Sequence, residues 1–176
     1  MTITMVNIEG YLTEARLAAA LRQIVGDRWS GVELKIAGSK RRWDMGFHEA
    51  GRRVVVEYDG DEHYRNTLKI KADREKDALA VASGLTVVRI PYWVQLDRVT
   101  VRHYFGFDAE ISQSFPHGFI STKLFPASFC ELGLARFECE LSSLPTVVRE
   151  AVVRSLTDRI AEYGREWVVP AAMSIP

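Results

Sequence analysis

The hydrophobic pattern of the chain opens with an amphipathic helix. Thr13 is a suitable N-cap for a helix over residues 13–25. Apolar residues at helical spacing give this helix one buried face, made of Leu12, Leu17, Leu21 and Ile24. The period changes over residues 32–36, where apolar and charged residues alternate, and this alternation predicts a half-buried strand.

Two short apolar runs with a glycine between them predict a β-hairpin. The runs cover residues 45–47 and 54–56. Gly51 can adopt the positive φ that a tight connection requires, so the turn is expected at Ala50 and Gly51. With the strand that precedes it, the hairpin forms an antiparallel three-stranded meander.

Three further elements follow the hairpin. A charged helix is expected over residues 66–83, and Gly84 is a fitting C-terminal stop. The nearly unbroken apolar run over residues 85–90 is typical of a buried central strand, and Arg89 within it is placed to approach a site or to satisfy a buried acid. Residues 145–163 predict another amphipathic helix. The face of the charged helix that is expected to pack on the sheet consists of Leu68, Ala72, Leu79 and Ala82.

Composition limits the class of protein. The 176 residues suffice to bury a core as one domain, and 47% apolar residues with zero formal net charge indicate a soluble globular protein. Neutral charge argues against a high-affinity general DNA binder, yet it is compatible with a local basic stripe. Cys130 and Cys139 lack metal-site spacing and are expected as reduced thiols, with a disulfide as the alternative. No secretory signal or membrane span is recognisable, so a cytoplasmic location without a membrane partner is expected.

The position of the turn determines which charged residues meet. It places Asp44 opposite Glu57, and alternation along the strand puts Glu57 and Asp59 on one face. Like charges facing each other destabilise paired strands, so such a patch needs a counter-charge. Mg²⁺ prefers oxygen ligands, and the spacing therefore predicts a metal site held by Asp44, Glu57 and Asp59. The alternative is a solvated strand end whose acids diverge into water.

Basic residues surround the predicted carboxylate patch. Lys40, Arg41 and Arg42 come just before Asp44, and Arg52 is expected to join them from across the hairpin. Lysine and arginine contacts to phosphate position a nucleic acid without reading its sequence. These four residues are therefore the candidate nucleic-acid contacts. Solvated hairpin charges remain the alternative.

The order of these features resembles the PD-(D/E)XK nuclease superfamily. Asp44 is followed by Glu57-x-Asp59-Gly60-x-x-His63, a charged helix and the strand over residues 86–90. Within the superfamily the chain resembles a small bacterial branch related to the very-short-patch repair endonuclease. The resemblance covers residues 10–95 well and the remainder loosely. It implies a restriction-endonuclease-like core over residues 1–95, with a C-terminal extension over residues 96–176 packed on it within one structural domain.

The resemblance also implies roles for the site residues. Asp44, Glu57 and Asp59 would hold Mg²⁺ or Mn²⁺, and His63 would act as a general base or hold the leaving group. The superfamily usually has a lysine two residues after the glutamate, and here Asp59 occupies that position. Lys69, Arg74 or Lys76 on the charged helix would replace the missing cation, with Lys76 as the chosen candidate; a solvated face of charged pairs is the alternative. Glu14 is a candidate fourth acid, or else a residue that suits the positive end of its helix.

The resulting expectation is an α/β fold with the order helix, antiparallel three-stranded meander, helix and further strand, followed by a mainly helical C-terminal extension. Its implied activity is metal-dependent hydrolysis of phosphodiester bonds, with DNA as the partner, and cutting both strands would suggest a homodimer. One alternative is a catalytically inactive nuclease-fold protein that serves as a nucleic-acid-binding or assembly subunit. Another is a metal-dependent hydrolase of a small phosphoester.

Overall fold

The structure, a computed structural model, describes residues 5–36, 38–115, 117–119 and 124–173. Two short 3₁₀ helices accompany the α-helices and strands. The elements follow in the order β1 (Val6–Ile8), α1 (Glu14–Val25), η1 (Gly26–Arg28), β2 (Trp29–Lys35), β3 (Arg42–Glu49), β4 (Arg52–Asp59), α2 (Glu62–Arg65), α3 (Thr67–Ala82), β5 (Leu85–Pro91), α4 (Arg98–Phe105), β6 (Ile111–Gln113), η2 (Pro126–Ser128), α5 (Glu131–Ser143), α6 (Thr146–Tyr163) and α7 (Arg165–Val168).

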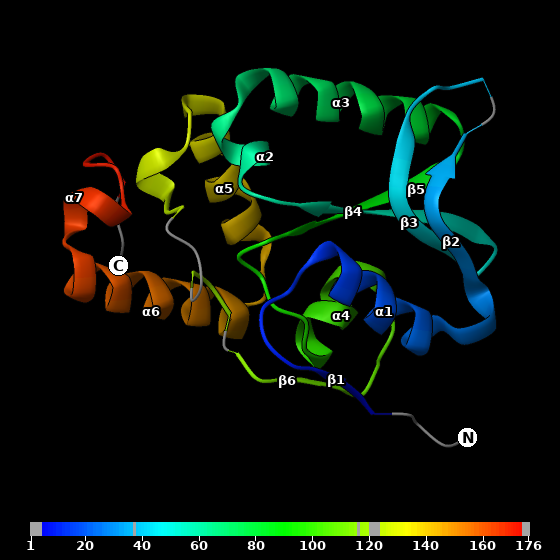
Figure 1. Cartoon of the computed structure of the whole chain (residues 1–176), viewed down its shortest axis with the longest axis horizontal. Helices are drawn as coiled ribbons and strands as arrows, with labels where there is room; N and C mark the ends of the chain where they lie inside the picture. The colour runs from blue at the N-terminus through cyan, green and yellow to red at the C-terminus, as the bar shows by residue number, and fades with distance from the viewer. Residues whose placement is uncertain (1–4, 37, 116, 120–123, 174–176) are drawn as a thin grey trace.

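A four-stranded sheet organises the first half of the chain. Its strand order is β2-β3-β4-β5, with β2, β3 and β4 antiparallel and β5 parallel to β4. Helix α3 lies along one face of the sheet, whereas α1 and α4 lie on the other (Figure 1). The expected α/β order of helix, three-stranded meander, helix and further strand is confirmed. A second, two-stranded sheet pairs β1 with β6.

The hairpin forms as the sequence indicates. Glu49 pairs with Arg52, so the connection has two residues, and both take positive φ: 47° at Ala50 and 77° at Gly51. This conformation matches the right-handed twist of the strands. It fixes the β3–β4 register, in which Met45 pairs with Val56. Asp44 and Glu57 are the next residues of the two strands, and the backbone N–H of Asp44 donates a hydrogen bond to the Glu57 side chain.

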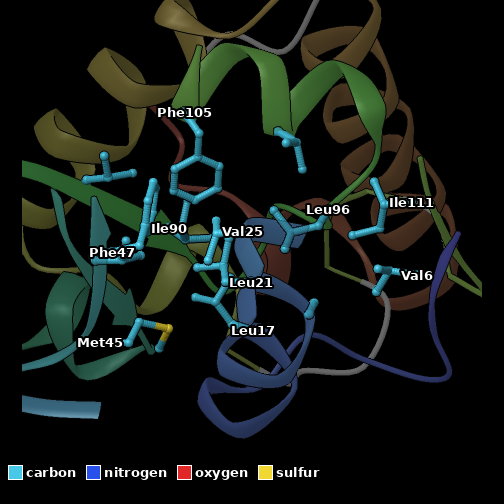
Figure 2. Packing of buried hydrophobic residues seen from close by; sticks show 14 of the residues in the cluster. Val6, Leu17, Leu21, Val25, Met45, Phe47, Ile90, Leu96, Phe105 and Ile111 are labelled. Atoms are coloured by element: carbon cyan, nitrogen blue, oxygen red, sulfur yellow. The ribbon is translucent and has the colours of Figure 1, made fainter. Parts of the chain in front are cut away.

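The largest core lies between the sheet and the helices α1 and α4. Leu17 and Leu21 of α1 are fully buried against Met45, Ile90 and other residues of the sheet. Figure 2 shows side chains of α1, the sheet and α4 meeting in this cluster. The predicted helix begins as expected, because the Thr13 side chain accepts a hydrogen bond from the backbone N–H of Arg16.

Two strand predictions need correction. Val32 is 57% exposed, because the positive φ of Glu33 breaks the expected alternation on this edge strand. Strand β5 pairs only with β4 among the described strands, so it lies at the edge of the sheet. Its apolar run reflects burial of both faces, since Val88 packs on the α1 side and Leu85 packs on the α3 side.

The predicted packing face of α3 is also wrong. Leu68 is 75% exposed, whereas the buried residues are Ile70, Asp73 and Ala80. The helix turns a largely polar face to the sheet because the opposing end of β4 is itself charged. Helix α3 therefore delivers charged side chains to the interior of the domain.

The C-terminal residues are mainly helical, as expected, and contribute a second core. Phe119, Phe137 and residues of α6 pack there with Tyr64 and Trp93 from residues 1–95. The predicted helix over residues 145–163 corresponds to α6. Both cysteines are free thiols, and Cys139 is exposed and not a core residue.

Candidate functional site

Glu57 occupies a buried position near the end of β4, and both of its oxygens are engaged. Its Oε2 accepts a hydrogen bond from Lys76 Nζ at 2.6 Å, and its Oε1 accepts one from the backbone N–H of Asp44 at 3.1 Å. The side chains of Glu57 and Lys76 are only 4% and 15% exposed. The structure thus brings together three of the predicted site residues, one from each of β3, β4 and α3.

Asp44 reaches this position through an irregularity in β3. Trp43 packs on the α3 side of the sheet and Met45 packs on the α1 side, although strict alternation would put both on one side. The Asp44 side chain turns toward β4, where its Oδ2 accepts a hydrogen bond from the backbone N–H of Tyr58 at 2.8 Å. Side chain and backbone of Asp44 therefore both bind the segment that carries Glu57.

Glu14 is a third carboxylate that interacts electrostatically with Asp44 and Lys76. Burial and then the negative charge of Asp44 raise the pKa of Glu14, while Lys76 opposes the rise. Burial and then the charge of Asp44 likewise raise the pKa of Glu57, again against Lys76. We call these four residues, Glu14, Asp44, Glu57 and Lys76, the Glu57 group. Three carboxylates and one ammonium group leave it with an excess of negative charge.

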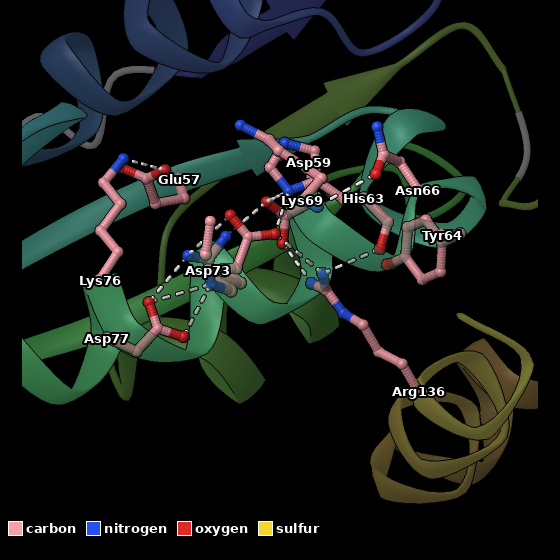
Figure 3. A network of polar contacts seen from close by, with 12 residues as sticks. Glu57, Asp59, His63, Tyr64, Asn66, Lys69, Asp73, Lys76, Asp77 and Arg136 are labelled. Carbon is pink, nitrogen blue, oxygen red and sulfur yellow. Dashed lines mark hydrogen bonds and ion pairs between the residues drawn. The ribbon is translucent and has the colours of Figure 1, made fainter. Parts of the chain in front are cut away.

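Asp59 belongs to a different set of contacts, although it lies only two residues after Glu57. It is fully buried, and its Oδ1 accepts a hydrogen bond from Arg89 Nη1 at 2.7 Å. Its Oδ2 accepts one from Arg136, which reaches in from α5 (Figure 3). His63 Nδ1 lies 3.0 Å from Asp59 Oδ1 and 2.6 Å from Asp73 Oδ2. We call these five residues the Asp59 network.

The expected single carboxylate patch therefore divides into two. Asp59, His63 and Asp73 are the residues of the described chain whose potential metal-binding atoms all lie within 4.8 Å of one another. Asp44, Glu57 and Asp59 do not meet this criterion. The acids of the Asp59 network already have cationic partners in Arg89 and Arg136, so these guanidinium groups stand where a metal ion would bind.

The pKa of Asp73 agrees with this view of the Asp59 network. Burial acts to raise it, but the hydrogen bond with His63 and the charge of Arg89 outweigh burial and lower the pKa. Asp73 is thus held as a carboxylate between cations. The network joins the end of β4 to α3, β5 and α5.

The four residues predicted to contact phosphate differ in their partners and in their distance from Glu57. Lys40 is exposed, Arg41 donates hydrogen bonds to the Ala72 carbonyl and to Glu75, and Arg42 pairs with Glu33. Arg52 lies opposite Glu49 at the turn, at the other end of β4 from the Glu57 group. Glu57 is the fifth residue after Arg52 along the strand, a distance of roughly 17 Å. The expectation that Arg52 joins the other three is wrong.

Arg136 and Asp73 are site residues that the sequence did not single out. Arg136 pairs with Glu140 one turn later on α5, so it looks like half of an ordinary surface ion pair. Its other partner, Asp59, lies 77 residues earlier in the chain. Of the two roles expected for Arg89, approaching a site or satisfying a buried acid, its hydrogen bond to the buried Asp59 confirms the second.

Comparison with known proteins adds no identification. No protein-family model, curated protein or solved structure matches the chain. None of the helices in the described ranges combines the length and the apolar character needed to cross a membrane.

Proposed function

We propose that this protein is a divalent-metal-dependent endonuclease that hydrolyses phosphodiester bonds of DNA on a PD-(D/E)XK-like core. The observation that carries the proposal is the contact between Lys76 and Glu57 beside Asp44. Two acids and a lysine are the groups that the resemblance calls for, and here the lysine comes from α3. The position two residues after Glu57 remains occupied by Asp59.

The donor set of the Glu57 group suits Mg²⁺ or Mn²⁺. Asp44 and Glu57 offer carboxylate oxygens, and Mg²⁺ commonly uses one or two carboxylates together with waters and substrate phosphate. Burial first, and then the negative charge of Asp44, raise the pKa of Glu14 and the pKa of Glu57, and a divalent ion bound there would offset that charge. A metal bound there would supply an activated water and neutralise charge on the phosphate.

The chain's own residues would divide the remaining work. The Lys76 ammonium group, which contacts Glu57, would stabilise negative charge that develops on the phosphate oxygens. Lys40, Arg41 and Arg42 precede Asp44 directly and would hold flanking phosphates in position. We assign Asp59 and His63 to holding β4 against α3 and α5, since their side chains contact Asp73, Arg89 and Arg136.

Cleavage of fluorescent oligonucleotides tests the proposal. With Mg²⁺ or Mn²⁺, Asp44→Asn and Lys76→Met should each lower the rate by about 100-fold or more, because each removes a group that acts on the phosphate. Glu62→Gln, an exposed carboxylate on α2, serves as the control and should cleave normally. Inhibition by mononucleotides as strong as by short oligonucleotides would instead indicate a small phosphoester as the substrate.

A non-catalytic nucleic-acid-binding or assembly subunit is the second candidate. The full burial of Asp59 at the position of the usual lysine favours it, because the residue there serves the architecture. This candidate predicts retained oligonucleotide binding by the wild type with no cleavage in either metal, and equal binding by Lys76→Met and Glu62→Gln.

A further inference from the structure

Lys76 is held inside the Glu57 group by two attachments. Its ammonium group donates to Glu57 Oε2 at 2.6 Å. The same Nζ lies 5.4 Å from the centroid of the Trp43 ring, within range of a cation–π interaction. The side chain is 15% exposed, so its charge is largely withdrawn from solvent. A lysine in this setting occupies the place of a bound cation.

The position of Lys76 conflicts with metal binding by Glu57. Glu57 Oε1 already accepts a hydrogen bond from the backbone N–H of Asp44, and Oε2 accepts from Lys76. Each oxygen keeps a second lone pair, but a divalent ion that binds Oε2 would lie beside the Lys76 ammonium group, and the two positive charges would repel each other. The backbone donor is fixed by β3, whereas the lysine is attached through a flexible four-carbon stem.

We propose that Lys76 is a tethered cation that competes with the divalent metal for Glu57 and is released when the metal binds. The inference rests on the proposed function, because it concerns the same metal site. Trp43 provides the released ammonium group with a second attachment, so Lys76 stays beside the metal instead of moving into solvent. Competition thus weakens metal binding, while release delivers the lysine toward the phosphate.

The competition predicts that loss of Lys76 raises the affinity for the divalent metal. Removing a residue of the site normally weakens metal binding, but removing the Lys76 charge should strengthen it. The variant frees Glu57 Oε2 and leaves the carboxylates without a counter-charge. Loss of one unit charge in direct contact with the ligand should tighten divalent binding by about tenfold or more.

Calorimetric titration with Mn²⁺, in the absence of DNA, tests the competition. Lys76→Met should bind Mn²⁺ about tenfold more tightly than the wild type. Lys71→Met removes an exposed charge from the same helix and should bind like the wild type. Lys76→Gln repeats the test with a neutral polar side chain in case methionine disturbs folding. The double variant Lys76→Met/Glu57→Gln should not show the tighter Mn²⁺ binding of Lys76→Met, because the competition requires the Glu57 carboxylate.

The outcomes separate this inference from the proposed function. The competition would be overturned if both Lys76 variants bound Mn²⁺ as tightly as the wild type or more weakly. If Glu57→Gln nevertheless abolished the Mn²⁺ binding of the wild type, the metal site itself would stand. An equal gain in Lys71→Met would also overturn it, since the effect would then be one of overall charge. Absence of Mn²⁺ binding in every variant would overturn both proposals.

Discussion

Glu57 and Asp59 show how two acids on one strand acquire different roles. Glu57 faces Lys76, whereas Asp59 is enclosed by Arg89, Arg136 and His63. The meeting of Asp44 and Glu57 follows from the turn and the register, which are local properties of the sequence. The partner of Asp59 on α5 follows only from tertiary packing. The sequence therefore predicts the first pair and not the second.

Gly133 allows α5 to come close enough for Arg136 to reach Asp59. A Cβ at Gly133 would lie 1.7 Å from the backbone oxygen of Tyr64. We expect Gly133→Ala to lower the free energy of unfolding by about 3 kcal/mol or more, because backbone must move to admit the methyl group. Gly60→Ala is the control, since a Cβ there meets nothing within 4 Å, and it should cost no more than about 0.5 kcal/mol. Equal urea midpoints for the two variants would contradict this packing.

At the scale of elements, α3 departs most from its sequence pattern. Its apolar residues at helical spacing suggested a buried stripe, yet Leu68 is exposed and Asp73 is buried. The apolar side of a helix normally packs on the core. That side does not face the core here, because the sheet presents Glu57 and Asp59 to the helix. Lys76 of α3 pairs with Glu57, and His63 links Asp59 to Asp73 of α3.

Truncation of single residues on α3 distinguishes its two faces. Ile70, 2% exposed, packs in the interior, so Ile70→Ala should lower the free energy of unfolding by about 2–4 kcal/mol. Leu68→Ala removes a similar side chain from the exposed face and should change it by no more than about 0.5 kcal/mol. Urea unfolding measures both. If Leu68→Ala lowered the free energy of unfolding more than Ile70→Ala, the packing face predicted from the sequence would be correct and this account of α3 wrong.

Helix α4 carries a pH-dependent contribution at its N-terminus. Asp97 caps the helix by accepting from the Thr100 backbone at 2.8 Å, and it contacts His117 Nε2 at 3.0 Å. Burial acts to raise the pKa of Asp97, but these hydrogen bonds outweigh it and hold the pKa below the ordinary 3.8. A depressed carboxyl pKa stabilises the fold above the unfolded value, and this stability is lost as the pH falls through the folded value.

The Asp97→Asn variant isolates this contribution. Asparagine can still cap α4 but carries no charge for His117. The wild type should have the higher melting temperature at about pH 6, and the gap should shrink as the pH falls below about 3.8. A gap that stays constant over this range would contradict the role given to the Asp97 charge.

At the scale of the whole molecule, the Asp59 network connects the sheet to the C-terminal helices. Arg136 donates to Asp59 and, through Nε, to Glu140 at 2.7 Å, and its guanidinium carbon lies 4.8 Å from the Tyr64 ring centroid. Tyr64 in turn donates to Glu140 at 2.6 Å. Residues from β4, α2 and α5 thus share one buried set of charges. The C-terminal extension contributes to the architecture at the end of β4.

A double-mutant cycle measures this connection. Asp59→Asn should lower the free energy of unfolding by about 3 kcal/mol, because it leaves buried guanidinium groups without their shared carboxylate. In an Arg136→Met background the same change should cost at least about 1 kcal/mol less. Asp108→Asn, at the exposed pair with Arg102, should cost no more than about 0.5 kcal/mol. Additive effects of Asp59→Asn and Arg136→Met would contradict the coupling.

The central claim is that Glu57 directs metal-dependent hydrolysis of DNA, and plasmid cleavage tests it most directly. Supercoiled plasmid would be incubated with Mg²⁺ or Mn²⁺ and either the wild type or Glu57→Gln, which keeps the shape of the side chain. We expect nicked or linear product with the wild type and a rate at least about 100-fold lower with the variant. Absence of cleavage by the wild type in both metals, or equal cleavage by Glu57→Gln, would contradict the claim.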